Sequence, residues 1–284
     1  MHDPETVMIR RILCFLLLLP AAGGLAAATP EGAVEVPAGR FQMGCSPGDT
    51  DCQTDEGPVG GTSVMVNAFW IDRYEVSVAE YRECVAAGAC ERPFDHARNP
   101  YCNFGAPGRD DYPLNCVDWF QAQAFCGWRD ARLPFEAEWE KAARGGTLTR
   151  YPWGNGAATC EYAVMDDGVY ISPEGETDGC GRDRLEERGS RAPNPLGLHD
   201  MQGSVSEWVH NWYDPEAIAE RYPAEDLSGP DEGRRRVIRG GAWDEGSARQ
   251  RSSSRWGKVP KGHRSIYTSN GFRCAGSLAD PLAQ

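Results

Sequence analysis

Alternating apolar and polar residues predict short strands towards both ends of the chain. Residues 34–43 (VEVPAGRFQM) and 62–71 (TSVMVNAFWI) show this pattern, and a proline and a glycine interrupt the first of them. Strand signals return at residues 236–240 and around residues 271–274. We therefore expect early and late strands to build the β part of the fold.

Helical spacing of apolar residues predicts three helices in the first half of the chain. The first begins after Ser77, which has capping-box spacing to Glu80. The second begins at Asp118, and apolar residues recur along the ten positions that follow it. The third is expected at residues 135–144, with Pro134 before it and a double glycine after it.

Long stretches between these elements are rich in glycine and proline, of which the chain has 33 and 20. A length of 284 residues allows one large domain or two small ones. No internal repeat, low-complexity tract or linker divides the chain. Residues 29–284 are therefore predicted to form one α+β domain with little regular secondary structure.

The N-terminal segment has the pattern of a secretory signal peptide. Arg10 and Arg11 precede a short apolar run at residues 12–19, and small residues follow as far as Ala28. The run is too short to span a bilayer. We predict that residues 1–28 are removed and that the mature chain, without a transmembrane segment, is periplasmic or secreted.

Ten cysteines remain after residue 28, an even number that suits an oxidising compartment. Zinc is the alternative, but no CxxC motif or Cys/His cluster with ligand spacing occurs. Four close pairs each bracket a loop rich in glycine or proline, so we expect local disulfides, although the sequence does not prove connectivity. The pairs are Cys45 and Cys52, Cys84 and Cys90, Cys102 and Cys116, and Cys160 and Cys180.

Charge is distributed unevenly along the chain. Residues 234–264 carry eight Arg, two Lys and two acids, whereas residues 29–233 carry 16 basic and 37 acidic residues. These arginines either pair with carboxylates of the earlier chain or form an anion-seeking surface. The segment 239–275 around them is predicted to be a long surface loop between two short strands. The net charge of −13 argues against a nucleic-acid partner.

Six ordered motifs carry a family resemblance over residues 34–275. They are VPAGRFQMG, FWIDRYEVSVAEYRECV, CVDWFQAQAFCGWRDARLPFEAEWEKAARGG, YPWGN, PNPLGLHDMQGSVSEWVHNWYD, and RVIRGGAW with SNGFRCA. The chain resembles the formylglycine-generating enzyme (sulfatase-modifying factor) superfamily. The resemblance implies a disulfide-stapled α+β fold akin to that of C-type lectins. It also implies a disulfide between Cys126 and Cys274.

Copper chemistry is not expected at the site that the resemblance points to. The family's enzymes oxidise a protein cysteine to formylglycine with oxygen and with copper held by two cysteines. The matching positions here are Glu245 and Gln250, and the serine of the GGS motif is Ala242. Because Cu(I) selects soft sulfur ligands, no catalytic residue is assigned. An iron site is not expected either, since the histidines are scattered at positions 2, 96, 199, 210 and 263.

A calcium site is implied at residues 200–207. Its ligands would be the side chains of Asp200 and Glu207 and the backbone carbonyls of Gly203 and Val205. Two carboxylates joined by a Gly-Ser turn make an all-oxygen site suited to a hard cation. The alternative is a structural turn in which Glu207 pairs with an arginine.

A second calcium site of the family would map to the side chains of Glu161 and Asp178. The carbonyls of Tyr162 and Cys180 would complete it. Here Glu161 stands where the family usually has Asn, so the local match is looser.

The arginine-rich segment also supplies the candidate ligand-binding residues. Arginine suits carboxylate or sulfate, and Trp offers a flat apolar face. An exposed rim is expected for three of these residues, while Trp243 has a second interpretation as a core residue. The candidates are Trp243, Glu245, Arg249, Arg251, Arg255 and Trp256, with the rim at Arg249, Arg251 and Trp256.

Three functions stay open on this basis. The first is an exported, calcium-stabilised module that binds a peptide, a protein or an anionic small ligand. The second is an enzyme: either a formylglycine-generating oxidoreductase acting on protein cysteine, or one with altered oxygen-dependent chemistry and Glu245 as an acid/base group. The third is a purely structural, calcium-stapled domain.

Overall fold

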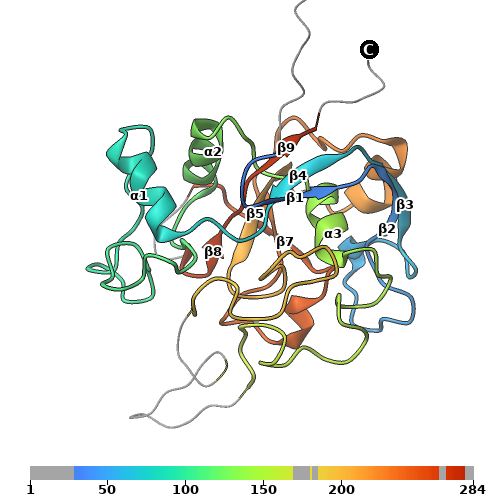
Figure 1. Ribbon diagram of the computed structural model, residues 1–284. Coiled ribbons are helices and arrows are strands. Elements are labelled where there is room, and N and C mark those ends of the chain that lie inside the picture. Colours follow the sequence, from blue (N-terminus) through green and yellow to red (C-terminus); the bar gives the residue numbers. More distant parts are fainter. Residues whose placement is uncertain (1–28, 169–179, 181–184, 262–266, 279–284) are drawn as a thin grey trace, which may run out of the picture.

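The computed structural model describes residues 29–168, 180, 185–261 and 267–278 (Figure 1). The predicted signal peptide at residues 1–28 and the candidate ligand Asp178 lie outside these ranges. Within the described part of the chain, no helix has the length and apolar character needed to cross a bilayer.

Among the described residues, nine short strands form three small sheets. The strand orders are β1-β4-β9, β2-β3 and β7-β6-β5-β8, and all pairs are antiparallel except β5 with β8. The strands are β1 (Ala33–Val36), β2 (Gly39–Met43), β3 (Thr62–Val66), β4 (Phe69–Asp72), β5 (Ser206–Trp212), β6 (Arg236–Arg239), β7 (Arg255–Lys258), β8 (Asn270–Gly271) and β9 (Ala275–Ser277).

Each of the two long strands predicted near the N-terminus is in fact a pair. The first divides at Pro37, which lacks a backbone N–H, and at Gly39, whose φ is 146°. As a result β1 pairs with β4, and β2 pairs with β3 in a separate sheet. The alternation therefore located the strands correctly but did not show that the chain changes sheets between them.

The three predicted helices are confirmed. Ser77 and Glu80 form a full capping box at the start of α1, and Asp118 and Gln121 form one at the start of α2. The third helix ends at Gly145, which adopts the left-handed conformation that this C-cap requires. The α-helices are α1 (Val78–Ala86), α2 (Trp119–Trp128) and α3 (Glu136–Arg144), and the short 3₁₀ or π segments are Thr54–Glu56, Ala217–Arg221, Tyr222–Ala224 and Ser247–Gln250.

Two hydrophobic clusters flank the strands of the central sheet. Figure 1 shows α1 and α2 on one side of β5, and α3 with β2 and β3 on the other. Trp139 of α3 is fully buried in one cluster, and Tyr81 and Phe125 stack at 5.5 Å in the other. The expected α+β domain with little regular secondary structure is confirmed.

Five disulfides staple the fold. The four local pairs and the Cys126–Cys274 bridge are all present, the last spanning 148 residues between α2 and the end of the chain. All ten cysteines between residues 45 and 274 are therefore bridged. The zinc alternative is wrong for these residues, because a bridged cysteine cannot supply a thiolate ligand.

The arginine-rich segment 239–275 is not the surface loop that its polarity predicts. It contains the strand β7, and Ser252, Ser253 and Ser254 are buried. Its polar side chains are instead satisfied by carboxylates from the first half of the chain. Among the described residues of this segment, those at 250–255 are thus a polar part of the interior, whereas others such as Asp244 and Trp256 are exposed.

Candidate functional site

The double glycine after β6 begins a tight turn whose inside is filled by Gln250. A Cβ on Gly241, whose φ is 71°, would lie 2.6 Å from the side-chain oxygen of Gln250. The Gln250 amide donates to the carbonyls of Ala242 at 3.1 Å and Glu245 at 3.0 Å, and the side chain is fully buried. The amide nitrogen of Gln250 therefore closes the turn.

Glu245, at the other position matched to a copper cysteine, is half-buried and within the electrostatic influence of Lys258 from β7. Burial, and then the charge of Asp244, raise the pKa of Glu245, whose carboxylate accepts a hydrogen bond from Ser206. Burial lowers the pKa of Lys258, on which the charge of Glu245 also acts. The Lys258 ammonium donates to the Asn270 side chain at 2.5 Å. Glu245 and Lys258 therefore act on each other electrostatically, and burial shifts the pKa of each towards that of the other.

Several polar atoms around this site are buried without a hydrogen-bond partner among the described residues. They are the indole nitrogen of Trp243, the side-chain oxygen of Gln250 and the side-chain nitrogen of Asn270. Buried polar groups normally have partners, so these atoms are candidate contacts for a ligand.

The exposed edge of the site is formed by Arg249 and Trp256. The guanidinium of Arg249 lies 4.3 Å from the centre of the Trp256 ring, and Trp256 is 50% exposed. With Glu245 and Ser206, both residues line a shallow hollow of about 10 Å³, so a ligand here would lie on the rim and not inside it. The rim prediction therefore agrees with the placement of these two side chains.

The rim prediction is wrong for Arg251. Its side chain is 2% exposed and bonds to both oxygens of Glu56 at 2.5 and 2.7 Å, and to Asp49 at 3.2 Å. Both acids lie about two hundred residues earlier in the chain, Asp49 on the loop closed by the Cys45–Cys52 disulfide and Glu56 in the short helical segment just after it. Arg251 is part of the interior and is not available to a ligand.

Arg255 and Trp243 are also interior residues. Arg255 is bidentate to Glu136 at 2.7 and 2.8 Å, and both side chains are fully buried. Trp243 is 6% exposed and stacks on Tyr101 with ring centres 5.6 Å apart. The prediction that Arg255 binds a ligand is therefore wrong. Trp243 agrees with its alternative interpretation as a core residue. For Arg251 and Arg255, pairing with earlier carboxylates is confirmed.

The turn predicted to bind calcium holds a buried ion pair. Glu207 accepts from Arg273 at 2.7 to 2.9 Å and from the indole of Trp139 at 2.8 Å. Asp200 and Ser204 both have positive φ, 53° each, so the backbone between the two acids is tightly curled. The pairing of Glu207 with an arginine is confirmed, while calcium binding stays a prediction.

A third acid next to this turn was not foreseen from the sequence. Glu75 is fully buried and accepts from the backbone N–H of Val205 at 3.4 Å, while its other oxygen has no partner among the described residues. Burial, followed by the charge of Asp200, raises its pKa well above the ordinary value. Arg273 is the cation that acts on it, and Glu207 acts as a further negative charge. A buried excess of acid over arginine is the kind of environment that a cation would stabilise.

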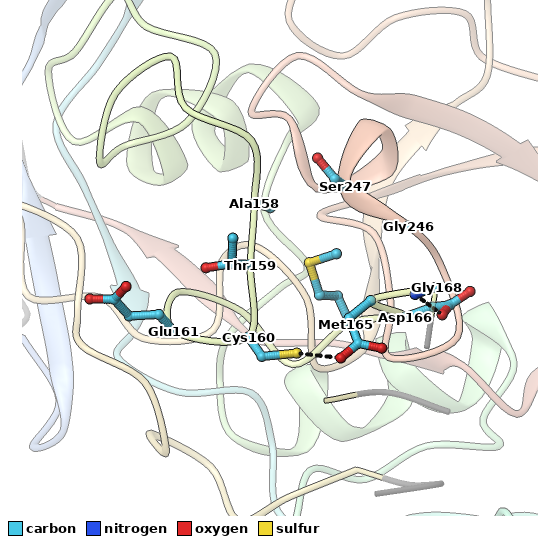
Figure 2. Close-up of a pocket in the computed structure, with 10 residues that line it drawn as sticks. Ala158, Thr159, Cys160, Glu161, Met165, Asp166, Gly168, Gly246 and Ser247 are labelled. Carbon is cyan, nitrogen blue, oxygen red and sulfur yellow. Dashed lines mark hydrogen bonds between the residues drawn. The ribbon is translucent and has the colours of Figure 1, made fainter. Parts of the chain in front are cut away.

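The second predicted calcium site cannot be assembled from the described residues, since Asp178 lies outside them. Glu161 lines a pocket of about 620 Å³ with Asp166 and Ser247. Figure 2 shows Glu161 and Asp166 at opposite ends of this pocket. Cys180 is placed by its disulfide to Cys160, and Tyr162 stacks on Trp153 at 4.8 Å.

No group of three or more His, Cys, Asp and Glu side chains within the described ranges has an arrangement suited to a metal ion. The described histidines have other contacts. His199 stacks on Tyr74 at 4.8 Å, His210 contacts Phe135 at 5.0 Å, and His96 contacts the carbonyl of Cys102 at 3.2 Å.

Lys258 is a residue of this site that was not predicted, although the sequence contains a signal for it. Lys258 lies two residues after Trp256, and alternate residues of a strand point to the same face. Because β7 has only four residues, and two of them are Arg and Lys, no strand was predicted there.

Comparison with known proteins gives a consistent result. Residues 22–278 match the sulfatase-modifying factor enzyme 1-like domain. The chain is 32% identical to the formylglycine-generating enzyme of Thermomonospora curvata, over 89% of this chain and 94% of that protein. It is 31% identical to the inactive C-alpha-formylglycine-generating enzyme 2 of Bos taurus, over 87% of this chain and 89% of that protein.

Solved structures show the same fold. PvdO from Pseudomonas aeruginosa matches with a TM-score of 0.65 and 26% identity, covering 87% of this chain and 94% of PvdO. Treponema denticola variable protein 1 matches with a TM-score of 0.60 and 21% identity, covering 86% of this chain and 94% of that protein. The second match concerns the fold alone.

Proposed function

We propose that this chain, which belongs to the family of sulfatase-modifying factor enzyme 1-like domains, is a binding module without copper-dependent oxidase activity. Its relatives include proteins named as formylglycine-generating enzymes and proteins named as inactive ones. Membership alone therefore does not decide between oxidase and binder, and the proposal depends on the site.

The observation that carries the proposal is the state of the two positions that match copper cysteines. Gln250 is buried and bonded to two backbone carbonyls, and Glu245 offers a hard oxygen within the electrostatic influence of Lys258. Every cysteine from 45 to 274 is bridged, so none of them can act as a thiolate. These residues do not fit Cu(I), which selects soft sulfur ligands.

Binding is supported by the exposed edge of the same site. Arg249 supplies a planar donor for a carboxylate, and Trp256 supplies an apolar face that is half exposed. Exposed aromatic and arginine side chains are the residues that most often dominate binding energy at protein interfaces. The ligand class that fits is a peptide or small molecule with a negative group next to an apolar one.

Binding can be tested with an array of short acidic peptides, each carrying one aromatic or aliphatic residue. Arg249→Ala and Trp256→Ala should each weaken binding of the captured peptides by about tenfold or more, the size expected for an interface hot spot. Arg82→Ala removes an exposed arginine of α1, far from the site in sequence, and serves as the matched control. Capture that is equal in all four proteins would contradict the proposal.

Acid–base catalysis is a second candidate, favoured by the paired shifts at Glu245 and Lys258. The raised pKa of the Glu245 carboxyl and the lowered pKa of the Lys258 ammonium are shifts in the direction that acid–base catalysis uses. The captured peptides should therefore be examined by mass spectrometry after incubation. A change in peptide mass that Glu245→Gln abolishes would favour the enzyme, and unchanged peptides would favour the binder.

Calcium at residues 200–207 is part of the proposal, as a stabilising ion rather than a catalytic one. Asp200 and Glu207, with the carbonyls of Gly203 and Val205, would hold it. Support comes from the unpartnered oxygen of Glu75 and from the three acids that share Arg273.

Five disulfides indicate an extracellular or lumenal protein, because such bridges persist in oxidising compartments. We further propose that residues 1–28 direct export and are then removed. N-terminal sequencing of the protein from its native host should begin near Thr29, and a start at Met1 or Met8 would contradict export through this segment.

A further inference from the structure

A cavity of about 440 Å³ lies between the β1–β2 corner and the C-terminal end of α3. None of the residues that line it belongs to the candidate site described above. Its volume falls in the range of small-molecule sites, about 300–1,000 Å³. Figure 1 shows α3 lying next to β2, and the Gly145-Gly146 turn that follows α3 lines the cavity.

Apolar side chains make most of the wall. Val36 and Phe41 come from β1 and β2, Leu196 from the loop before β5, and Leu148 from the turn after α3. Leu148 is 54% exposed, so part of its apolar surface is in contact with water. An apolar ligand placed here would cover it and remove its surface from water.

One cation projects into this apolar cavity without a carboxylate partner. Lys141 donates to the carbonyls of Pro37 at 2.6 Å and Gly39 at 3.0 Å. Burial alone lowers the pKa of Lys141, with no neighbouring charge contributing. Since an ammonium has three hydrogen-bond donors, one remains for a ligand.

The two arginines that line the cavity each have a carboxylate partner, and Arg144 shares its partner Glu140 with Arg239. Arg144 bonds to Glu140 at 2.8 Å and to the carbonyl of Gly44 at 2.5 Å, and is almost completely buried. Arg40 pairs with Glu225 at 3.0 Å on the surface. Lys141 is thus the single uncompensated charge that this cavity offers within the described residues.

We propose that the cavity binds a monocarboxylate with an apolar tail. The carboxylate bonds to Lys141, and the tail packs against Phe41, Leu148 and Leu196. An uncharged apolar molecule would leave the lysine without a counter-ion, and a small anion would gain nothing from the walls. A polyanion would bring more negative charge than one lysine can neutralise.

Isothermal titration calorimetry with three probes tests both halves of the proposal. Octanoate has the charge and the tail, acetate has only the charge, and 1-octanol has only the tail. Octanoate should bind at least about tenfold more tightly than either of the others, as expected for a charge-assisted hydrogen bond added to apolar burial. Equal affinity for octanoate and 1-octanol would overturn the role of Lys141.

Two variants separate the site from general effects. Lys141→Met keeps the apolar stem and removes the charge, so octanoate binding should weaken by about tenfold while binding of 1-octanol is unchanged. Lys261→Met, at an exposed lysine outside the cavity, is the matched control and should bind as the wild type does.

Leu148→Glu places a negative charge at the mouth on an exposed position, where folding tolerates it. It should reduce octanoate binding without lowering Tm, so the proposal stays testable even if Lys141→Met unfolds. Octanoate binding that is unaffected by Leu148→Glu and by a folded Lys141→Met would overturn the proposal.

Discussion

Arginine side chains in this protein have two different roles, and burial decides which. Arg251, Arg255 and Arg273 are fully enclosed and bonded to carboxylates from distant parts of the chain. Arg249 lies at the edge of the same segment, against an exposed Trp. Removing one member of a buried pair leaves the other charge unpaired in the interior, whereas an exposed pair is solvated by water.

Substitution at Arg251 tests this difference. Arg251→Met should lower the free energy of unfolding by about 3–5 kcal/mol, because Glu56 and Asp49 stay buried without their counter-ion. Arg40→Met, which breaks an exposed pair with Glu225, should cost less than about 1 kcal/mol. Urea denaturation measures both values, and equal costs would contradict the burial of Arg251.

Glu136 gives a prediction on pH. Burial alone would raise its pKa, but the charges of Arg255 and then Arg239 hold it below the ordinary value. A lowered pKa in the folded protein contributes stability above the unfolded value, near 4.5, and this contribution is lost as the pH falls through the folded pKa. The stability difference between wild type and Glu136→Gln should therefore be large at pH 7 and shrink below about pH 4.5. A difference that stays constant with pH would contradict the ion pair.

At the scale of elements, local signals predicted the helices and long-range contacts decided the rest. The capping residues Ser77 and Asp118 act within one turn, so the sequence alone located α1 and α2. The strand β5 was missed because five of its seven residues are buried, which removes the alternation that marks a strand with one solvated face. The partners of Arg251 are about two hundred residues away, and no local pattern could reveal them.

The disulfides connect these elements over very different distances in sequence. In the chain-entropy account a bridge over 148 residues is worth about 5 kcal/mol, and one over six residues about 2 kcal/mol. Replacing Cys126 and Cys274 by Ala should therefore destabilise the protein more than replacing Cys84 and Cys90. Thermal unfolding of the two double variants checks the order, and the reverse order would mean that the α2 staple is not a main constraint on the chain.

At the scale of the whole molecule, the chain has the fold of its family, and Glu245 and Gln250 occupy the two positions that the resemblance matches to copper cysteines. The same fold retains the turn predicted to bind calcium, with three acids around one arginine. Most of this could be inferred from sequence, because the motifs that carry it are local. Three features could not be inferred, since each depends on side chains brought together by folding. They are the hydrogen bonds of Gln250 within its turn, the unpartnered oxygen of Glu75 and the cavity lined by Lys141.

Calcium should stabilise the whole domain if the turn binds it. At calcium concentrations about 100-fold above Kd, the linkage adds about 2.7 kcal/mol, so chelation should lower Tm by roughly 5 °C or more. Asp200→Asn should remove this response, and Asp231→Asn, at an exposed acid, should keep it. Identical melting curves of the wild type in calcium and in chelator would show that Arg273 alone neutralises the acids.

The central claim is that this member of the family does not carry out copper-dependent oxidation of cysteine. The most direct measurement is mass spectrometry of a Cys-x-Pro-x-Arg peptide after incubation with the purified protein, copper and oxygen, with the Thermomonospora curvata relative as positive control. We predict that the relative converts the peptide to the aldehyde and that this protein leaves its cysteine unchanged. Aldehyde formed by this protein, and lost in the Glu245→Gln variant, would contradict the claim.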